Sequence, residues 1–141
     1  MKRKASAVWK GGIKDGKGTI STDSGVLADT QYSFSTRFED GKGTNPEELI
    51  GAAHAGCFSM ALSGALGAVG LTAESIQTSA AVTLDKVGEG FAITAVHLTV
   101  AAKVPGADEN TFMTAAVNAK EGCPVSQLLN AEITMDANLE N

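Results

Sequence analysis

The chain has 141 residues, the length of one ordinary domain, and we expect residues 1–141 to fold as a single domain. Hydrophobic residues make up 43% and charged residues 19% of it, which excludes the disordered, fibrous and disulfide-scaffold classes. The net charge of −5 argues against nucleic acid as a partner, because a phosphate backbone is bound through cationic side chains. We find no uninterrupted apolar run near the ~18 residues that span a bilayer and no secretory segment, so we expect a cytoplasmic protein with no membrane partner.

The N-terminal third is divided by turn-forming pairs, Gly11-Gly12, Asp15-Gly16 and Ser24-Gly25. They predict an antiparallel meander of short strands, with strands over residues 5–10 and 18–22 and a continuation over 32–39. Part of this region resembles a phosphate-binding loop, but Gly18 stands where such a loop needs Ser or Thr, and a strand follows where a helix is required. A hairpin turn is the better interpretation.

A long helix is predicted to follow the meander. Asn45 can cap it, Pro46 suits its first position, and two acidic residues fall in its positively polarised first turn. Nearly every residue from 49 to 69 is apolar or small, so we expect this helix to be covered on most sides. Its glycines weaken it by up to about 1 kcal/mol each. Close packing of another backbone would explain why they are tolerated.

The second half reads as two long strands, a helix and a final strand. Apolar alternation over 76–84 and a hairpin loop at 87–90 predict an antiparallel pair with residues 91–104. Asp108 can cap a second helix that stops before Cys123 and Pro124 and is followed by one helical turn over 125–130. Residues 131–139 alternate strictly, as in a half-buried strand. The fold class is therefore α+β, with helices covering one face of antiparallel sheet.

Two cysteines and a histidine allow a metal site as one interpretation. His54 and Cys57 share a helical face at i and i+3, and Cys123 could be a third ligand. A structural zinc site takes four protein ligands, and the remaining histidine, His97, lies on a strand with no paired ligand nearby. An open three-ligand site stays possible by this count, and a metal-dependent hydrolase would use one.

Thiol redox chemistry explains more of these residues. Cys57 lies beyond the reach of the dipole at the helix N-terminus, so a reactive thiolate there needs a nearby cation, and Arg37 can supply it. A carboxylate from the helix start could orient the guanidinium. The thiolate would attack a peroxide, become a sulfenic acid and condense with Cys123. The alternative of a different class is a non-enzymatic binding module for an apolar ligand, in which both cysteines are simply buried.

Two stretches of the sequence resemble a known family. They are Thr36-Arg37-Phe38-Glu39 with residues 43–62, including Asn45-Pro46-Glu47-Glu48 and His54-Ala55-Gly56-Cys57, and the segment 119–126 around Gly122-Cys123-Pro124. They resemble the family of osmotically inducible protein C (OsmC), which includes the organic hydroperoxide resistance proteins. The likeness extends from about residue 9 to the C-terminus and includes both cysteines.

The resemblance implies a thiol-dependent peroxidase that reduces organic hydroperoxides, and hydrogen peroxide less efficiently, without a cofactor or metal, in oxidative or osmotic stress defence. Cys57 would be the peroxidatic residue and Cys123 the resolving one. Arg37 would activate the thiolate, with Glu47 rather than Glu48 positioning it. The implied architecture is an OsmC-like fold of antiparallel sheets with a long central helix, in an intertwined homodimer with active sites at the subunit interface. The implied reductant is a dithiol or a thiol protein.

Helix geometry bears on that dimer. Ten helical residues separate Glu47 from Cys57 by ~15 Å along the axis and roughly 80° in direction. The two cannot meet on one straight helix. Either the helix breaks near Gly51 or Gly56, or Glu47 serves the cysteine of the other subunit, and we predict the second arrangement.

The substrate pocket is the least constrained part of the prediction. Phe38, Phe58 and Met60 are expected to offer an apolar wall to an alkyl tail. The same residue types would also suit a protein core.

Overall fold

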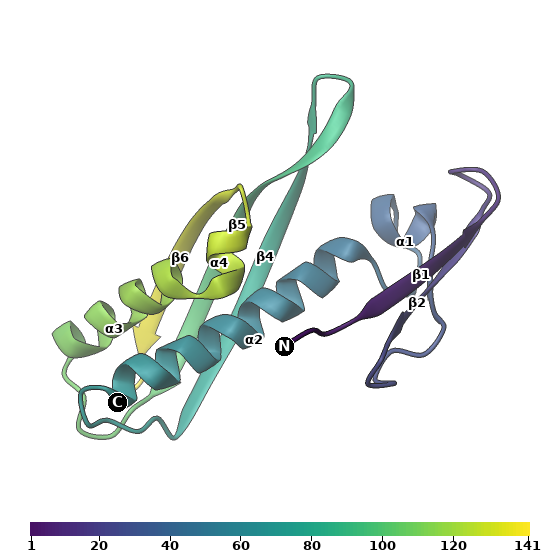
Figure 1. The fold of residues 1–141 in the computed structure, drawn as a ribbon. Helices are drawn as coiled ribbons and strands as arrows, with labels where there is room; N and C mark the ends of the chain where they lie inside the picture. The colour runs from purple at the N-terminus through teal and green to yellow at the C-terminus, as the bar shows by residue number, and fades with distance from the viewer. The chain divides into compact units, whose positions relative to one another are not determined.

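A computed structural model describes residues 1–141 of the chain. The residues form two compact units, 1–49 and 50–141, and each unit is described by itself. Figure 1 shows their helices and strands coloured along the chain. The expectation of a single domain stays a prediction.

The first unit contains a small antiparallel sheet in the order β1-β2-β3. Its strands are β1 (Ala5–Lys10), β2 (Lys17–Thr22) and β3 (Thr30–Tyr32). Ala5 pairs with Thr22 and Lys10 with Lys17, so the intervening glycine-rich segment is a hairpin connection. Gly11 has a φ of 99°, a backbone conformation that residues other than glycine rarely adopt. The predicted meander is confirmed for these strands, and the hairpin occupies the place of the phosphate-loop-like pattern.

The predicted strand over 32–39 is wrong beyond Tyr32, because a short helix, α1 (Phe34–Phe38), occupies this segment. Ser33 caps it: the Thr36 N–H donates to Ser33 Oγ at 3.3 Å, and the Ser33 N–H donates to Thr36 Oγ1 at 2.8 Å. This reciprocal capping box outweighs the preference of the aromatic residues for a strand. It places Arg37 in the last turn of α1.

The long helix α2 (Pro46–Gly67) runs without a break from the end of the first unit into the second. Asn45 Oδ1 accepts a hydrogen bond from the Glu48 N–H at 2.8 Å, which satisfies one of the free donors of its first turn. The predicted helix start is confirmed. A helix break at Gly51 or Gly56 is excluded, since both residues lie inside continuous helix.

The second unit has a three-stranded sheet in the order β4-β5-β6. β4 (Ser75–Val87) and β5 (Gly90–Lys103) form the predicted antiparallel hairpin. β6 (Glu132–Leu139) pairs with β5 in parallel, so this sheet is mixed rather than wholly antiparallel. The reason is the connection: α3 (Glu109–Gly122) and α4 (Pro124–Leu128) return the chain to the start of β5 before β6 begins.

The core of the second unit lies between one face of this sheet and the helices (Figure 1). It contains these buried side chains from α2, β5 and α3: Phe58, Leu62, Leu66, Val96, Leu98, Val100, Ala102, Phe112, Ala115, Ala116 and Ala119. On α2 the buried positions recur every three or four residues, which is the pattern of a helix with one covered face. The predicted arrangement of helices over one sheet face is confirmed for this unit.

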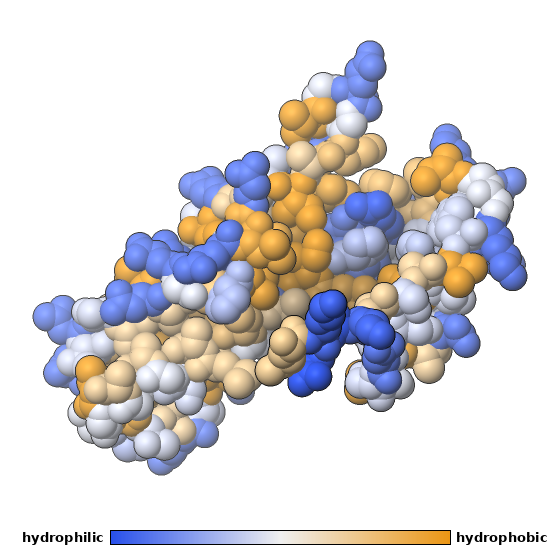
Figure 2. Space-filling view, viewed as in Figure 1, coloured by the Kyte–Doolittle hydropathy of each residue, from blue (hydrophilic) through white to orange (hydrophobic).

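The opposite face of α2 is uncovered, contrary to the expectation that the helix is covered on most sides. Glu48 in the first turn is its one exposed charged residue, and the exposed residues beyond it are small or uncharged: Ala52, Ala53, Gly56, Met60, Ser63, Gly64 and Gly67. Figure 2 shows moderately to strongly hydrophobic residues gathered on the visible side of the second unit. A Cβ atom added at Gly56, Gly64 or Gly67 would meet nothing within 4 Å, whereas one at Gly51 would lie 3.2 Å from the Ala80 carbonyl oxygen. Within this chain, close packing against another backbone therefore explains the glycine at position 51 but not those at 56, 64 and 67.

By length and composition α2 is also long and apolar enough to cross a membrane, although polar residues such as His54 and Ser59 interrupt its apolar sequence. The core helix of a soluble protein has the same properties. Phe58, Leu62 and Leu66 are fully buried in the core of the second unit. We therefore describe α2 as a core helix.

Candidate active site

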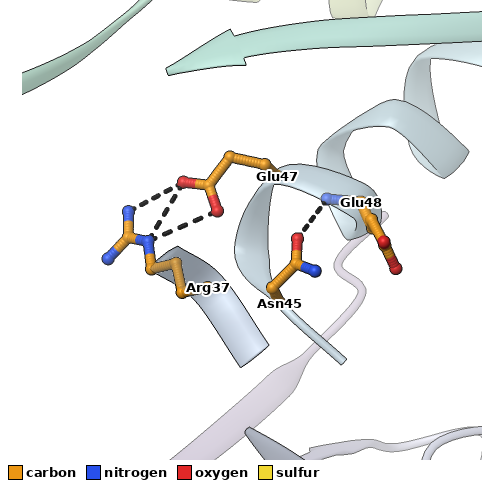
Figure 3. Close-up of polar contacts among 4 residues, drawn as sticks. All are labelled: Arg37, Asn45, Glu47 and Glu48. Carbon is orange, nitrogen blue, oxygen red and sulfur yellow. Dashed lines mark hydrogen bonds and ion pairs between the residues drawn. The ribbon is translucent and has the colours of Figure 1, made fainter. Parts of the chain in front are cut away.

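Arg37 and Glu47 form a bidentate ion pair within the first unit (Figure 3). Arg37 Nε donates to Glu47 Oε1 and Oε2 at 3.1 and 3.3 Å, and Nη2 donates to Oε1 at 2.9 Å. The Glu47 side chain is only 12% exposed, and that of Arg37 is 37% exposed. Glu48 points away from the pair (Figure 3). A fork of this kind fixes the plane of the guanidinium and leaves its remaining N–H groups free to face a ligand.

A cavity of about 230 Å³ adjoins Arg37 in the first unit. It is lined by Trp9, Ile13, Tyr32, Ser33, Phe34, Arg37 and Phe38. The rings are packed in pairs, with Trp9 and Tyr32 centroids 5.4 Å apart and Phe34 and Phe38 centroids 4.9 Å apart. The cavity thus combines a cation with an apolar aromatic wall.

The three residues predicted for the pocket wall have different surroundings within their own units. Phe38 lines the cavity beside Arg37, and the Arg37 Cζ atom lies 5.3 Å from the centre of its ring. Phe58 is fully buried in the core of the second unit, and Met60 is 79% exposed on α2. Phe58 therefore packs as a core residue, so its assignment to the pocket wall is wrong.

Cys57 and Cys123 come together in the second unit as free thiols. Cys57 is half-buried on α2 and packs against the core to which the fully buried Cys123 belongs. Cys123 precedes α4 with extended backbone angles, φ −57° and ψ 126°, as expected before Pro124. The two side chains are hydrogen-bonded to each other.

The surroundings of the two sulfurs favour different protonation states. Burial, followed by the hydrogen bond with Cys123, raises the pKa of the Cys57 thiol, and the Val125 backbone acts weakly in the other direction. Burial alone would raise the pKa of Cys123 as well. The interactions of its sulfur with Cys57, Ser126 and Val125 outweigh that effect and lower the pKa of the Cys123 thiol. In a single chain, the Cys123 thiol therefore ionises more readily than the Cys57 thiol.

His54, the third member of the metal hypothesis, does not join the cysteines as a ligand. It is fully buried, and its Nε2 atom lies 2.7 Å from Ser126 Oγ. Burial lowers the pKa of His54. The structure has no group of three or more His, Cys, Asp or Glu side chains placed to hold a metal ion. The proposed Cys/His metal site is therefore not assembled, and His97 is instead paired with Thr134 and Asp136.

Sequence reasoning missed two parts of this region. The aromatic cavity could have been suspected because four of the seven aromatic residues lie within the first 38 positions. Ser126 had a weaker signal: it lies three residues after Cys123, as His54 lies three residues before Cys57.

Comparison with known proteins decides the family. Residues 39–138 match the family model described as OsmC-like protein. The chain belongs to the OsmC family. It is 60% identical over 139 residues to the peroxiredoxin OsmC of Escherichia coli K12, covering 99% of this chain and 97% of that protein, and the figures for the Shigella flexneri peroxiredoxin OsmC are the same. The expected family and the expected activity class, a cysteine-based peroxidase, are confirmed.

Solved structures of this family share the fold. An OsmC-like protein of Mycoplasma pneumoniae superposes with a TM-score of 0.78 at 15% identity, covering 100% of this chain and 99% of its own. The organic hydroperoxide resistance protein OhrB of Bacillus subtilis superposes with a TM-score of 0.70 at 24% identity, covering 96% of this chain and 98% of its own. The expected OsmC-like α+β fold is confirmed.

Proposed function

We propose that the chain reduces organic hydroperoxides, with Cys57 as the peroxidatic thiol and Cys123 as the resolving thiol. The single observation that carries the proposal is the contact between these two free thiols, which come from segments 66 residues apart. Two buried cysteines of no function would have no reason to meet. The name of the Bacillus subtilis structural relative, an organic hydroperoxide resistance protein, supports the substrate class.

The chemistry has two steps. The Cys57 thiolate attacks the terminal oxygen of the hydroperoxide, so that an S–O bond forms, the O–O bond breaks, and the alkoxide leaves and takes up a proton to become the alcohol. Cys123 then attacks the sulfenic sulfur, an S–S bond forms, and the hydroxyl leaves with a proton as water. An external dithiol or thiol protein reduces the disulfide and completes the cycle.

The first step needs a Cys57 thiolate, which the single chain does not favour. The groups that set the pKa of Cys57 are burial, Cys123 and Val125, and none of them carries a positive charge. Arg37, fixed by Glu47, is a suitable cation. Because α2 is continuous, Glu47 and Cys57 of one chain are ~15 Å apart along the helix axis. We therefore assign the activating Arg37 to a second copy of the chain.

A homodimer also accounts for the uncovered face of α2. Beyond the first turn of the helix, which carries Glu48, this face has no charged residue, and three of its glycines face open space. Small residues permit close approach of a second helix, and such a patch is otherwise rarely left exposed. In the proposed dimer each Arg37–Glu47 pair serves the cysteines of the other subunit.

The cavity beside Arg37 supports an organic rather than a purely inorganic peroxide. Trp9, Tyr32 and Phe38 present apolar rings next to the guanidinium. An alkyl or aryl tail would bury apolar surface there while its peroxide group faces the cation. Hydrogen peroxide has no tail and would gain only the polar contacts, so we expect it to react less efficiently.

A cycle that passes through a reversible disulfide also requires a reducing compartment. We therefore place the protein in the cytoplasm, where dithiol reductants are available, with no membrane or nucleic-acid partner.

Mass spectrometry before and after one equivalent of cumene hydroperoxide tests the proposal. We expect the intact subunit to lose two free thiols and about 2 Da, the mass of two hydrogens, as a disulfide forms between Cys57 and Cys123. The matched control is Cys57→Ser, which should leave the hydroperoxide unconsumed. A binding module for an apolar ligand would leave both thiols free, and that result would overturn the proposed function.

A further inference from the structure

A polar pair lies beside the two cysteines. On α2, His54 precedes Cys57 by three residues, and around α4, Ser126 follows Cys123 by three residues. The two helical segments thus bring together a pair of sulfurs and a histidine–serine pair, with 2.7 Å between His54 Nε2 and Ser126 Oγ. All four side chains belong to the second unit.

The histidine is costly at this position. His54 is fully buried on the core-facing side of α2, where the other large side chains are Phe58, Leu62 and Leu66. Its Nδ1 atom is buried without a hydrogen-bonding partner. A buried polar atom left unpaired destabilises the fold, and an apolar side chain of similar volume would avoid that cost. A role in filling the core therefore does not account for His54.

Ser126 connects the histidine to the resolving cysteine. Its backbone N–H and, to a smaller extent, its hydroxyl interact with the Cys123 sulfur, and the hydroxyl also bonds to His54. A hydroxyl has one proton and two lone pairs, so it can donate to the sulfur while accepting from the imidazole. We assign the imidazole proton to Nε2, because the unpartnered Nδ1 is then a bare acceptor rather than an orphaned N–H group. The chain of hydrogen bonds then runs from His54 through Ser126 to Cys123.

We propose that His54 and Ser126 are positioning residues for the resolving step: the imidazole orients the Ser126 hydroxyl, and the hydroxyl holds Cys123 as a thiolate aimed at Cys57. This inference rests on the proposed peroxidase function and assigns it two further residues. Burial keeps His54 neutral, since it lowers the pKa of the imidazole, and a neutral imidazole provides the single Nε2 proton that the arrangement needs.

The step balances without another reactant. The Cys123 thiolate donates an electron pair to the sulfenic sulfur of Cys57, the S–S bond forms and the S–O bond breaks. Cys123 is oxidised and Cys57 is reduced, each by one electron equivalent. The departing hydroxide takes the proton that Cys123 has given up and leaves as water. Ser126 and His54 keep their own protons throughout.

Single-turnover kinetics with one equivalent of cumene hydroperoxide test the inference. Hydroperoxide loss reports the reaction of Cys57, and acid quenching followed by thiol alkylation and mass spectrometry reports disulfide formation. In Ser126→Ala we expect disulfide formation at pH 7 to slow about tenfold, the effect of losing one charge-assisted hydrogen bond, while hydroperoxide loss is not slowed. Ser126→Thr keeps the hydroxyl and should restore the rate.

The pH profile separates this role from a merely structural one. The titratable groups that face Cys123 are Cys57, from α2, and His54, through Ser126. In Ser126→Ala the rate of disulfide formation should rise at a higher pH than in the wild type and approach the wild-type rate above about pH 9, where the thiol ionises unaided. A hydroxyl that only holds α4 in place would give the same slowing at every pH, and that result would overturn the inference.

Substitutions at His54 test the role of the imidazole, and Ser59→Ala controls for the loss of a hydroxyl elsewhere on α2. His54→Gln keeps a donor near the position of Nε2 and should retain more of the disulfide rate than His54→Leu; equal rates would contradict the role of the imidazole. Ser59→Ala removes a different hydroxyl of α2, bonded to the Ala55 carbonyl and to Thr78, and should resolve at the wild-type rate. If the wild type itself forms no disulfide, the proposed function fails. If the wild type does so and Ser126→Ala matches it at pH 7, only the present inference fails.

Discussion

The side chains of Cys57 and Cys123 are hydrogen-bonded to each other although 66 residues separate them in the chain. Cys57 is fixed by a long helix that packs on the sheet, and Cys123 by the junction between α3 and α4. A disulfide requires Cα atoms about 4.4–6.8 Å apart. Contact between the reduced thiols means that the resolving step needs local adjustment rather than unfolding of a helix.

Replacing the resolving thiol should separate the two halves of the cycle. Cys123→Ser should consume one equivalent of cumene hydroperoxide per subunit and then stop, because the Cys57 sulfenic acid has no thiol partner in the chain. The measurement is mass spectrometry after adding dimedone, which attaches to a sulfenic acid. Continued turnover without an added thiol would contradict the role of Cys123.

The fork between Arg37 and Glu47 predicts that charge alone is insufficient at position 37. Arg37→Lys keeps the charge but loses the planar arrangement of donors, so kcat/KM for cumene hydroperoxide should fall roughly 10- to 100-fold. Glu47→Gln should have a comparable effect because the guanidinium loses its orienting partner. The matched control is Glu48→Gln in the same helical turn, which leaves the ion pair intact. An equal loss in Glu48→Gln would show that the effects at Arg37 and Glu47 do not come from their ion pair.

Local signals allowed much of the fold to be predicted from the sequence. Asn45 and Pro46 mark the start of α2, and Asp108 caps α3 by accepting a hydrogen bond from the Thr111 N–H at 2.7 Å. Helix caps and alternating strands depend on residues that are neighbours in the chain, so local sequence patterns predict them. The helix α1 was missed because its Ser33–Thr36 capping box spans only one turn within an aromatic-rich segment.

Relationships between distant segments were harder to predict. The parallel pairing of β6 with β5 depends on where α3 and α4 return the chain, which no local pattern records. A packed, hydrogen-bonded imidazole was the favoured interpretation of His54, with a metal site as the lesser alternative, but its partner Ser126 lies 72 residues away and no local pattern identifies it. Cys57 and Cys123 were linked through chemistry and family resemblance rather than through spacing.

Substitutions on the uncovered face of α2 test the dimer, because a larger side chain there should weaken association only if a second copy packs against this face. A side chain at Gly64 would meet nothing within 4 Å in a single chain, so Gly64→Ala should stabilise a monomer by up to about 1 kcal/mol through helix propensity. If a second copy packs there, Gly64→Leu should instead weaken association and reduce peroxidase activity. Light scattering coupled to gel filtration measures the change in mass. Asn118→Leu, at an exposed position of α3, controls for the added apolar surface, and a dimer unaffected by Gly64→Leu would place the interface elsewhere.

Burial of His54 predicts a loss of stability in mild acid. The pKa of His54 is lowered in the folded protein relative to the unfolded value of 6.5, so the unfolded chain takes up a proton before the folded chain does. The contribution to stability is therefore fully present above pH 6.5 and is lost as the pH falls from 6.5 through the folded-state pKa. Urea midpoints at pH 7.5, 6.5 and 5.5, at one protein concentration, measure this dependence. His54→Gln cannot titrate, so the fall between pH 6.5 and 5.5 should become smaller, whatever the variant does to stability at pH 7.5; an unchanged fall would mean that other groups cause it.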